Sequence, residues 1–251
     1  MYPQCEKILE QSLAIRTNVL PEVKKTIDNI QADFDGVVKY NTNIIEWLKP
    51  MVDLTGYHVY PRNGITEGLD WWYNRELRGV NMRKGDYQWI NSKDGEGKIA
   101  YISLPSAIDG NIDIGPKLCP IALDLAYVGS TQIKPIELDT VEYAFYSLSK
   151  SFGVRNIRTG WIFTKEPDPR LEALTFSAKY YNYYAHEVAE TIISNFDIDY
   201  IYNQLHNKQQ SVCDEYGFTP SDSVWLATTT DARYEKFMRD KVARLCLAPC
   251  F

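Results

Sequence analysis

The sequence predicts an α/β fold, a mostly parallel central sheet flanked by helices, with a small α+β unit near the C-terminus. Short apolar runs of strand length alternate with helical or turn segments through the first two thirds of the chain. After Pro169 the pattern changes to long helical stretches, and then to a strand, a helix and a strand. A length of 251 residues suits one large domain or two modest ones.

The elements follow from this patterning in chain order. Apolar residues at helical spacing predict amphipathic helices over 21–34 and 43–54, the second kinked or shortened by Pro50. Continuous apolar runs predict buried strands at 57–60, 99–104, 118–123, 143–148 and 160–163. Helical patterns cover 69–77, 171–196 and 200–216, and the final unit reads as a strand 223–228, a helix 232–240 and a strand 242–247. We therefore expect an N-terminal helical segment (1–35), a large domain (36–190) and a small C-terminal α+β domain (191–251).

Composition narrows the class of protein. The apolar fraction of 45% and the charged fraction of 24% are those of an ordinary globular chain, and the net charge of −6 disfavours a nucleic-acid partner. No apolar stretch resembles a signal peptide or a membrane span, so we expect no membrane partner and a cytoplasmic location. Five scattered cysteines fit a reducing compartment, and three distant histidines favour no metal site.

Two predicted strands end in side chains that favour a chemical site. The run beginning at Tyr143 ends in Lys150, and the run before it ends at Asp124, with Tyr127 close behind. A desolvated lysine loses affinity for its proton and becomes a nucleophilic amine able to form a Schiff base. A half-buried aspartate needs a cationic partner, which a protonated pyridine nitrogen would supply.

Two further segments suit a phosphate. Arg158 follows Lys150 by eight residues, and a guanidinium can hold a phosphate through two parallel hydrogen bonds. The turn 62–68 contains Asn63-Gly64 and opens a helical stretch, where unpaired N–H groups and the helix dipole attract anions.

Each piece alone has an ordinary interpretation: Lys150 and Arg158 as surface charges, Asp124 as a cap or turn residue, Asn63-Gly64 as a plain turn. Ser147-x-x-Lys150 also fits the acyl-serine enzymes that recognise penicillin, with Arg-Thr-Gly at 158–160 and Ser-Asp-Ser at 221–223. In that family the Arg-Thr-Gly strand follows the middle motif, whereas here it precedes it.

Taken together, the motifs resemble fold-type I enzymes that use pyridoxal 5′-phosphate (PLP), specifically the class I/II aminotransferases. The resemblance rests on Asp-Leu-Ala-Tyr at 124–127, Ser-Leu-Ser-Lys-Ser-Phe-Gly at 147–153 and Arg-Thr-Gly at 158–160. The turn Asn-Gly-Ile-Thr-Glu-Gly at 63–68 is similar to the phosphate loop of the histidinol-phosphate aminotransferase branch. The large domain would then be the PLP-binding domain.

The resemblance implies roles for individual residues. Lys150 would form the Schiff base with PLP, Asp124 would pair with the pyridinium nitrogen, and Tyr127 would donate to the ring's phenolic oxygen. The phosphate would be held by Ser147, Arg158 and the turn at Gly64, Ile65 and Thr66. Tyr87, with Trp89 as the alternative, would stack on the pyridine ring; their other interpretation is two sheet aromatics. Arg244 in Ala-Arg-Leu-Cys-Leu would bind the substrate α-carboxylate, and Tyr40 would reach the phosphate of a neighbouring subunit.

The match departs from the family in two respects. The chain is much shorter than the usual member, and Ala107 stands where the family has an asparagine that hydrogen-bonds the ring oxygen and the substrate carboxylate. The resemblance implies an enzyme, an aminotransferase acting as a homodimer on an L-amino acid and a 2-oxo acid. The alternatives are another PLP-dependent reaction, lyase or racemase, and a shortened PLP-binding relative without catalysis.

Overall fold

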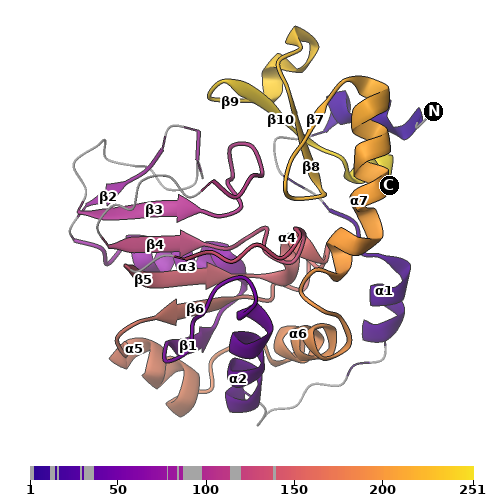
Figure 1. Ribbon diagram of the computed structural model, residues 1–251. Helices are drawn as coiled ribbons and strands as arrows, with labels where there is room; N and C mark the ends of the chain where they lie inside the picture. The colour runs from indigo at the N-terminus through magenta and orange to yellow at the C-terminus, as the bar shows by residue number, and fades with distance from the viewer. Residues whose placement is uncertain are drawn as a thin grey trace.

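The computed structural model describes residues 3–11, 15, 17–28, 30, 37–77, 79–83, 85–86, 98–113, 120–137 and 140–251. Its larger sheet has six strands in the order β1-β6-β5-β4-β3-β2 (Figure 1). Their bounds are β1 His58–Pro61, β2 Val80–Asn81, β3 Ile99–Ser103, β4 Ile121–Asp124, β5 Val141–Tyr146 and β6 Trp161–Thr164. Strands β2 to β5 run parallel, while β6 is antiparallel to both β5 and β1. The predicted mostly parallel sheet is confirmed.

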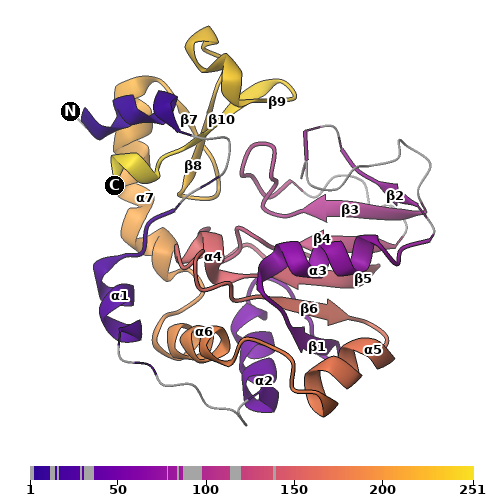
Figure 2. The same ribbon diagram turned by 180° about the vertical axis from the view of Figure 1, so that it is seen from behind.

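Helices cover both faces of this sheet (Figures 1 and 2). On one face α3 (Gly64–Tyr73) packs so closely that a Cβ at Gly68 would lie 2.9 Å from the Ile162 side chain and 3.2 Å from that of Phe145. On the other, α2 (Val37–Leu48) sets the Trp47 ring 5.9 Å from that of Tyr146. Helix α6 (Tyr183–Asn195) lies beside α2 and also contacts α1 (Pro21–Ile27). Buried side chains on both sides explain the continuous apolar strands.

The C-terminal elements form a second, antiparallel sheet of four strands in the order β7-β8-β10-β9. These strands are β7 Thr219–Pro220, β8 Leu226–Thr229, β9 Met238–Arg239 and β10 Val242–Cys246, and α7 (Tyr200–Tyr216) precedes them. Ile8, from a 3₁₀ helix at Pro3–Glu10, joins the apolar cluster of this sheet and α7. Both ends of the chain therefore lie beside the smaller sheet (Figure 1).

Some helices differ from the periodicity. The predicted helix 171–196 is divided into α5 (Pro169–Glu172), a π-helical turn (Ala173–Ser177) and α6. Asn182 caps α6 by accepting a hydrogen bond from the Ala185 N–H, so a new helix starts there. Helix α2 ends at Leu48, two residues before Pro50, as expected for a proline that cannot continue a helix. The predicted helix 232–240 is a 3₁₀ helix, Ala232–Phe237, followed by β9.

The cysteines differ from the expectation of a wholly reduced set. Cys213 and Cys246 are buried and take part in no disulfide, whereas Cys250 is disulfide-bonded. Within the described part of the chain, no helix is long and apolar enough to cross a membrane.

Candidate active site

Three neighbouring parallel strands, β3, β4 and β5, end at the same edge of the large sheet. The register aligns Ser103 with Asp124 across β3 and β4, and Asp124 with Phe145 across β4 and β5. Immediately after β5 comes the short helix α4 (Leu148–Ser151), which carries Lys150. Because carboxyl ends of parallel strands are where such sheets bind ligands, this edge is the natural position for a site.

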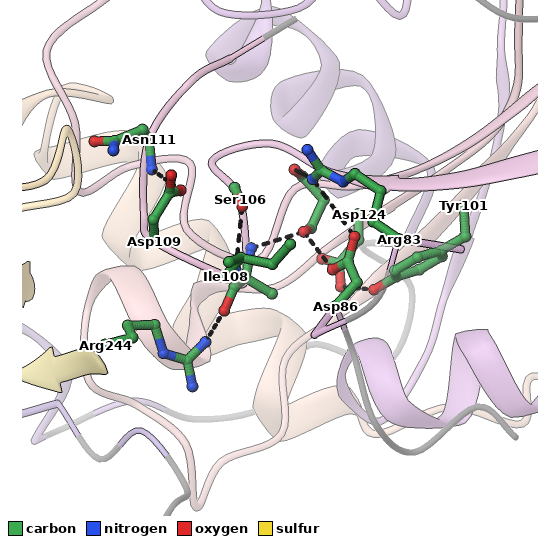
Figure 3. Close-up of polar contacts among 11 residues, drawn as sticks. Arg83, Asp86, Tyr101, Ser106, Ile108, Asp109, Asn111, Asp124 and Arg244 are labelled. Atoms are coloured by element: carbon green, nitrogen blue, oxygen red, sulfur yellow. Dashed lines mark hydrogen bonds and ion pairs between the residues drawn. The ribbon is translucent and has the colours of Figure 1, made fainter. Parts of the chain in front are cut away.

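Asp124 is a buried carboxylate, 2% exposed, held by two donors. The Tyr101 hydroxyl donates to Oδ2 at 2.6 Å (Figure 3). The N–H of Ala126 donates to Oδ1 at 2.8 Å. Burial raises the pKa of Asp124, whereas the charge of Lys150 and the two hydrogen bonds oppose that rise. Such a carboxylate attracts a further cation or N–H donor.

Lys150 and Tyr127 lie against each other beside Asp124. The Lys150 Nζ is 3.5 Å from the Tyr127 hydroxyl and 4.4 Å from the centre of its ring. The Tyr127 side chain is buried, so burial restricts its movement. Lys150 is half-buried. The amine, the phenol and the carboxylate are therefore grouped at one end of the sheet.

A pocket adjoins this group. It is lined by Ile65, Thr66, Asp124, Ala126, Ser147, Ser149, Lys150 and Arg158. Of the eleven residues singled out from the sequence, six line it: Ile65, Thr66, Asp124, Ser147, Lys150 and Arg158. Residues separated by more than ninety positions thus surround one space.

The Arg158 side of the pocket is built around two glycines. Gly64 has φ +80°, and a Cβ there would lie 2.8 Å from Nη2 of Arg158. At Gly160 a Cβ would lie 2.5 Å from the Gly64 Cα. Arg158, itself at φ 65°, donates from Nη2 to the Asn63 carbonyl at 3.1 Å. These close approaches bring the guanidinium to the N-terminus of α3, which favours an anion.

Ser147 ties the same region to the segment that precedes β6. Its hydroxyl donates to the Thr159 carbonyl at 2.6 Å and accepts from the Ser149 N–H at 3.1 Å. As the N-cap of α4, Ser147 fixes the turn that presents Lys150.

Arg244 projects from the smaller sheet to the segment that follows β3. It lies on β10, is 8% exposed, and donates from Nη1 to the Ala107 carbonyl (Figure 3). Its Nε is buried and has no hydrogen-bond partner. The Ala107 N–H donates to the Ser103 hydroxyl at 2.7 Å, which in turn donates to Oδ1 of Asp86 at 2.7 Å. A chain of contacts thus joins Arg244 to a second buried carboxylate.

Tyr40 lies elsewhere in this chain. It is buried on α2 and donates to both carboxylate oxygens of Glu187 on α6, at 2.5 and 2.7 Å. Its contact with a neighbouring subunit stays a prediction. Tyr87 and its alternative Trp89 fall outside the described residues.

Sequence reasoning missed Tyr101, Ser103 and Asp86. Strand alternation carried a usable signal for Tyr101, because it lies two positions before Ser103 in β3 and Ser103 pairs with Asp124. Asp86 lies outside any strand or motif, so no pattern marked it.

Metal ligands do not gather anywhere in the described part of the chain, where no group of three or more His, Cys, Asp and Glu could hold an ion.

Comparison with known proteins shows the fold. No protein-family model and no curated protein matches the sequence. Among solved structures, PLP-bound histidinol-phosphate aminotransferase from Sinorhizobium meliloti aligns with 94% of this chain and 86% of its own, at TM-score 0.65 and 14% identity. A PLP-bound C–S lyase from Staphylococcus hominis aligns with 94% of this chain and 86% of its own, at TM-score 0.68 and 10% identity. A putative PLP-dependent β-cystathionase from Corynebacterium diphtheriae aligns with 94% of this chain and 87% of its own, at TM-score 0.70 and 10% identity.

Proposed function

We propose that this chain is a PLP-dependent enzyme that transfers an amino group between an L-amino acid and a 2-oxo acid. The observation that carries the proposal is the grouping of Lys150, Asp124 and Tyr127 beside the pocket that Arg158 also lines. The likeness in fold to PLP-bound aminotransferases supports it.

The residues present fit the cofactor. The aldehyde of PLP needs an amine to which it can bond, and the Lys150 amine lines the pocket. A pyridinium nitrogen needs a buried carboxylate, and each Asp124 oxygen, already accepting one hydrogen bond, keeps a lone pair for another. A phosphate needs donors without side chains in the way. Gly160 leaves the space into which the Gly64 backbone packs, and Gly64 leaves the space that the Arg158 guanidinium occupies.

In this proposal Lys150 holds the cofactor through a covalent bond at Nζ, and Asp124 faces its ring nitrogen. Ser147, Arg158 and the backbone of Gly64, Ile65 and Thr66 bind its phosphate, and Tyr127 donates to its phenolic oxygen. When bound, the cofactor supplies an electron sink for negative charge at the substrate α-carbon. Tyr87 and Tyr40 keep their proposed roles of ring stacking and contact with a partner's phosphate in a homodimer.

The chain's own groups then position the substrate and move its proton. Arg244 binds the α-carboxylate, held in place by its bond to the Ala107 carbonyl. The Lys150 amine, once displaced by the substrate amine, would take the α-proton at Nζ and deliver it to the cofactor carbon that had carried the aldehyde. Asp124 would keep the ring nitrogen of the bound cofactor protonated. Replacing Asp124 should therefore slow the chemical step far more than it weakens substrate binding.

Elimination is the second candidate reaction. Two similar folds belong to a C–S lyase and a putative β-cystathionase, at TM-scores of 0.68 and 0.70. Ala107 stands where the resemblance implies an asparagine that supports the phenolic oxygen, so transamination would proceed without that support. A racemase, or a binder without catalysis, is the remaining outcome.

Product analysis separates these reactions. The PLP-loaded protein is mixed with an amino acid alone, and the products are identified. An aminotransferase converts one equivalent to the 2-oxo acid and stops until an acceptor is added. A lyase keeps releasing ammonia and a 2-oxo acid from a substrate with a sulfur leaving group. Continuous ammonia release would contradict transamination, and the absence of any product would leave a cofactor binder.

We also propose a cytoplasmic location, because the five cysteines are scattered along the sequence and the buried Cys213 lies outside any disulfide. The disulfide at Cys250 counts against it, because disulfides persist mainly in oxidising compartments.

A further inference from the structure

We propose that a second cavity, apart from the pocket beside Lys150, binds a free α-amino acid whose side chain is polar and uncharged. The cavity is lined by α7, by the turn after β7, and by the segments that follow β3 and β4, and it has a volume of about 210 Å³. It shares no lining residue with the pocket beside Lys150. Pockets for drug-sized ligands take roughly 300–1,000 Å³, so this space suits a smaller molecule, of amino-acid size.

Two opposite charges line the cavity, and one backbone residue fixes both. The Ile112 carbonyl accepts a hydrogen bond from Nζ of Lys134 at 3.1 Å, and the Ile112 N–H donates to Oδ2 of Asp222 at 2.7 Å. Lys134 Nζ and Asp222 Oδ2 are 3.9 Å apart, beyond hydrogen-bond distance. Among the described residues, the ammonium therefore keeps two N–H groups, and the carboxylate its second oxygen, for a ligand.

Helix α7 brings an aromatic pair to the same cavity. Tyr202 and His206 are four positions apart, so they share one face of the helix, and both line the cavity. Their rings stack with centroids 4.7 Å apart, and Nδ1 of His206 is buried without a hydrogen-bond partner. A buried polar atom without a partner costs free energy, so a ligand atom that bonds to this nitrogen would stabilise the site.

Gln209 holds α7 against the segment that carries Asp222. Its side chain is 1% exposed, and its Nε2 donates at 2.9, 3.0 and 2.8 Å to the carbonyls of Ser221, Ser223 and Leu226. The groups that would contact a ligand are therefore positioned before it binds, which lowers the entropic cost of binding.

The charges of the cavity select the chemical class of the ligand. A carboxylate alone would meet Lys134 but also the like charge of Asp222, and an amine alone would meet Asp222 but also the like charge of Lys134. A zwitterion places its carboxylate at Lys134 and its ammonium at Asp222, so each charge gains a partner.

The remaining lining restricts the side chain of the ligand. Gln132 and Gln210 present amide groups, and an apolar side chain would cover these amides without hydrogen-bonding to them. Lys134 and Asp222 are the only Lys, Arg, Asp or Glu residues in this lining, and they already take the two backbone charges of the amino acid. A charged side chain would therefore lack a counter-charge, and a polar, uncharged one fits.

Histidine NMR tests the proposal at the cavity itself, because the chain has only three histidines. The full-length protein, with ¹³C-labelled histidine rings, is titrated with L-glutamine, both with PLP and without it. The His206 signal, identified by its loss in His206→Gln, should shift and saturate, while the signals of His58 and His186 stay in place. An unmoved His206 signal at about 10 mM L-glutamine overturns the proposal.

Analogues of similar size identify the class of ligand. 4-Aminobutanamide lacks the carboxylate of glutamine, 4-carbamoylbutanoate lacks its ammonium, and L-leucine keeps both charges but has an apolar side chain. Each should bind about 10-fold or more weakly than L-glutamine. Binding as tight as that of L-glutamine contradicts a zwitterion site if either one-charge analogue shows it, and contradicts a polar side chain if L-leucine does.

Variants assign the binding to the two charges. Lys134→Gln and Asp222→Asn each remove one charge but keep hydrogen-bonding atoms, and each should weaken L-glutamine binding about 10-fold or more. The matched control is Lys49→Gln, because Lys49 lies 3.9 Å from Glu46, the same separation as in the cavity. It should change the affinity less than about 2-fold.

Unchanged affinity in folded Lys134→Gln and Asp222→Asn proteins overturns the assignment. The His206 signal reports on this cavity and not on the pocket beside Lys150, which His206 does not line. The proposed function can therefore fail while this site is confirmed, and this site can fail while PLP still binds Lys150.

Discussion

The Tyr101 hydroxyl lies 2.6 Å from Oδ2 of Asp124, and the two residues come from adjacent strands of the large sheet. This contact supplies the carboxylate with a neutral donor in a place where water is excluded. It therefore stabilises the charged form of Asp124 even before a ligand arrives.

Replacing Tyr101 with phenylalanine should lower the free energy of unfolding by about 1.5 to 3 kcal/mol at neutral pH, because a hydrogen bond to a charged group is lost. Urea unfolding followed by fluorescence measures it. The control is Tyr146→Phe, whose hydroxyl makes only a 3.4 Å contact with the neutral Val128 carbonyl. Equal losses of unfolding free energy in the two variants would show that the hydrogen bond to Asp124 stabilises the protein no more than the Tyr146 contact does.

The pH dependence of stability should reveal the buried carboxylate. Burial raises the pKa of Asp124 above its ordinary 3.8, so folding favours its protonated form. The stability that the protonated Asp124 gives the folded state is fully present below pH 3.8, and it is lost as the pH rises through the raised pKa. Without cofactor, Asp124→Asn should unfold at a higher urea concentration than the unmodified protein at pH 7, and the difference should vanish in acid.

Asp53 serves as a control with the opposite expected effect, because hydrogen bonds from Thr55 lower its pKa. Asp53→Asn should lose stability at pH 7. A destabilised Asp124→Asn protein at pH 7 would contradict the assignment of an unfavourable buried charge.

Gly64→Ala should weaken PLP binding at least 10-fold, because the new Cβ would meet Nη2 of Arg158 at 2.8 Å and displace it. Gly56→Ala is the matched control. Gly56 has φ +85° but no atom within 4 Å of a Cβ, so it shares the backbone strain of about 1 kcal/mol without the clash. Equilibrium titration with PLP measures both. Equal affinities would remove Arg158 and this turn from the phosphate site.

His186 should make the protein sensitive to acid. Burial, and the nearby charge of Arg62, lower its pKa from 6.5 to about 3. The stability it contributes is present above pH 6.5 and is lost as pH falls toward 3, because only the unfolded chain takes up the proton. The ring packs edge-on to Trp161, with centroids 5.1 Å apart.

His186→Phe preserves an aromatic ring and should shift the midpoint of acid unfolding to lower pH. His58→Gln, at a partly exposed histidine, should leave that midpoint unchanged. An unchanged midpoint in His186→Phe would mean that the buried imidazole is not responsible for acid sensitivity.

Sequence periodicity predicted the regular elements because each has a local cause. Helix α7 was predicted at 200–216, where it lies, since its apolar residues recur at helical spacing and Gly217 ends it at φ 69°. The break within 171–196 was missed, because its apolar pattern continues through the π-helical turn. Tertiary contacts, rather than local propensity, decide such breaks.

The pocket lining was predictable where residues follow strands or form a phosphate turn, as Asp124, Lys150 and Arg158 do. Asp86 was not predictable. Its position depends on how the β9–β10 hairpin rests against Gly85, and no local pattern encodes the packing of two distant segments.

Borohydride trapping tests the central claim most directly. The full-length protein is mixed with PLP, reduced, digested and mapped by mass spectrometry, beside a Lys150→Ala variant. We predict one stable pyridoxyl label, on Lys150, and none at that peptide in the variant. A label on a different lysine, or equal labelling of both proteins, would contradict the account.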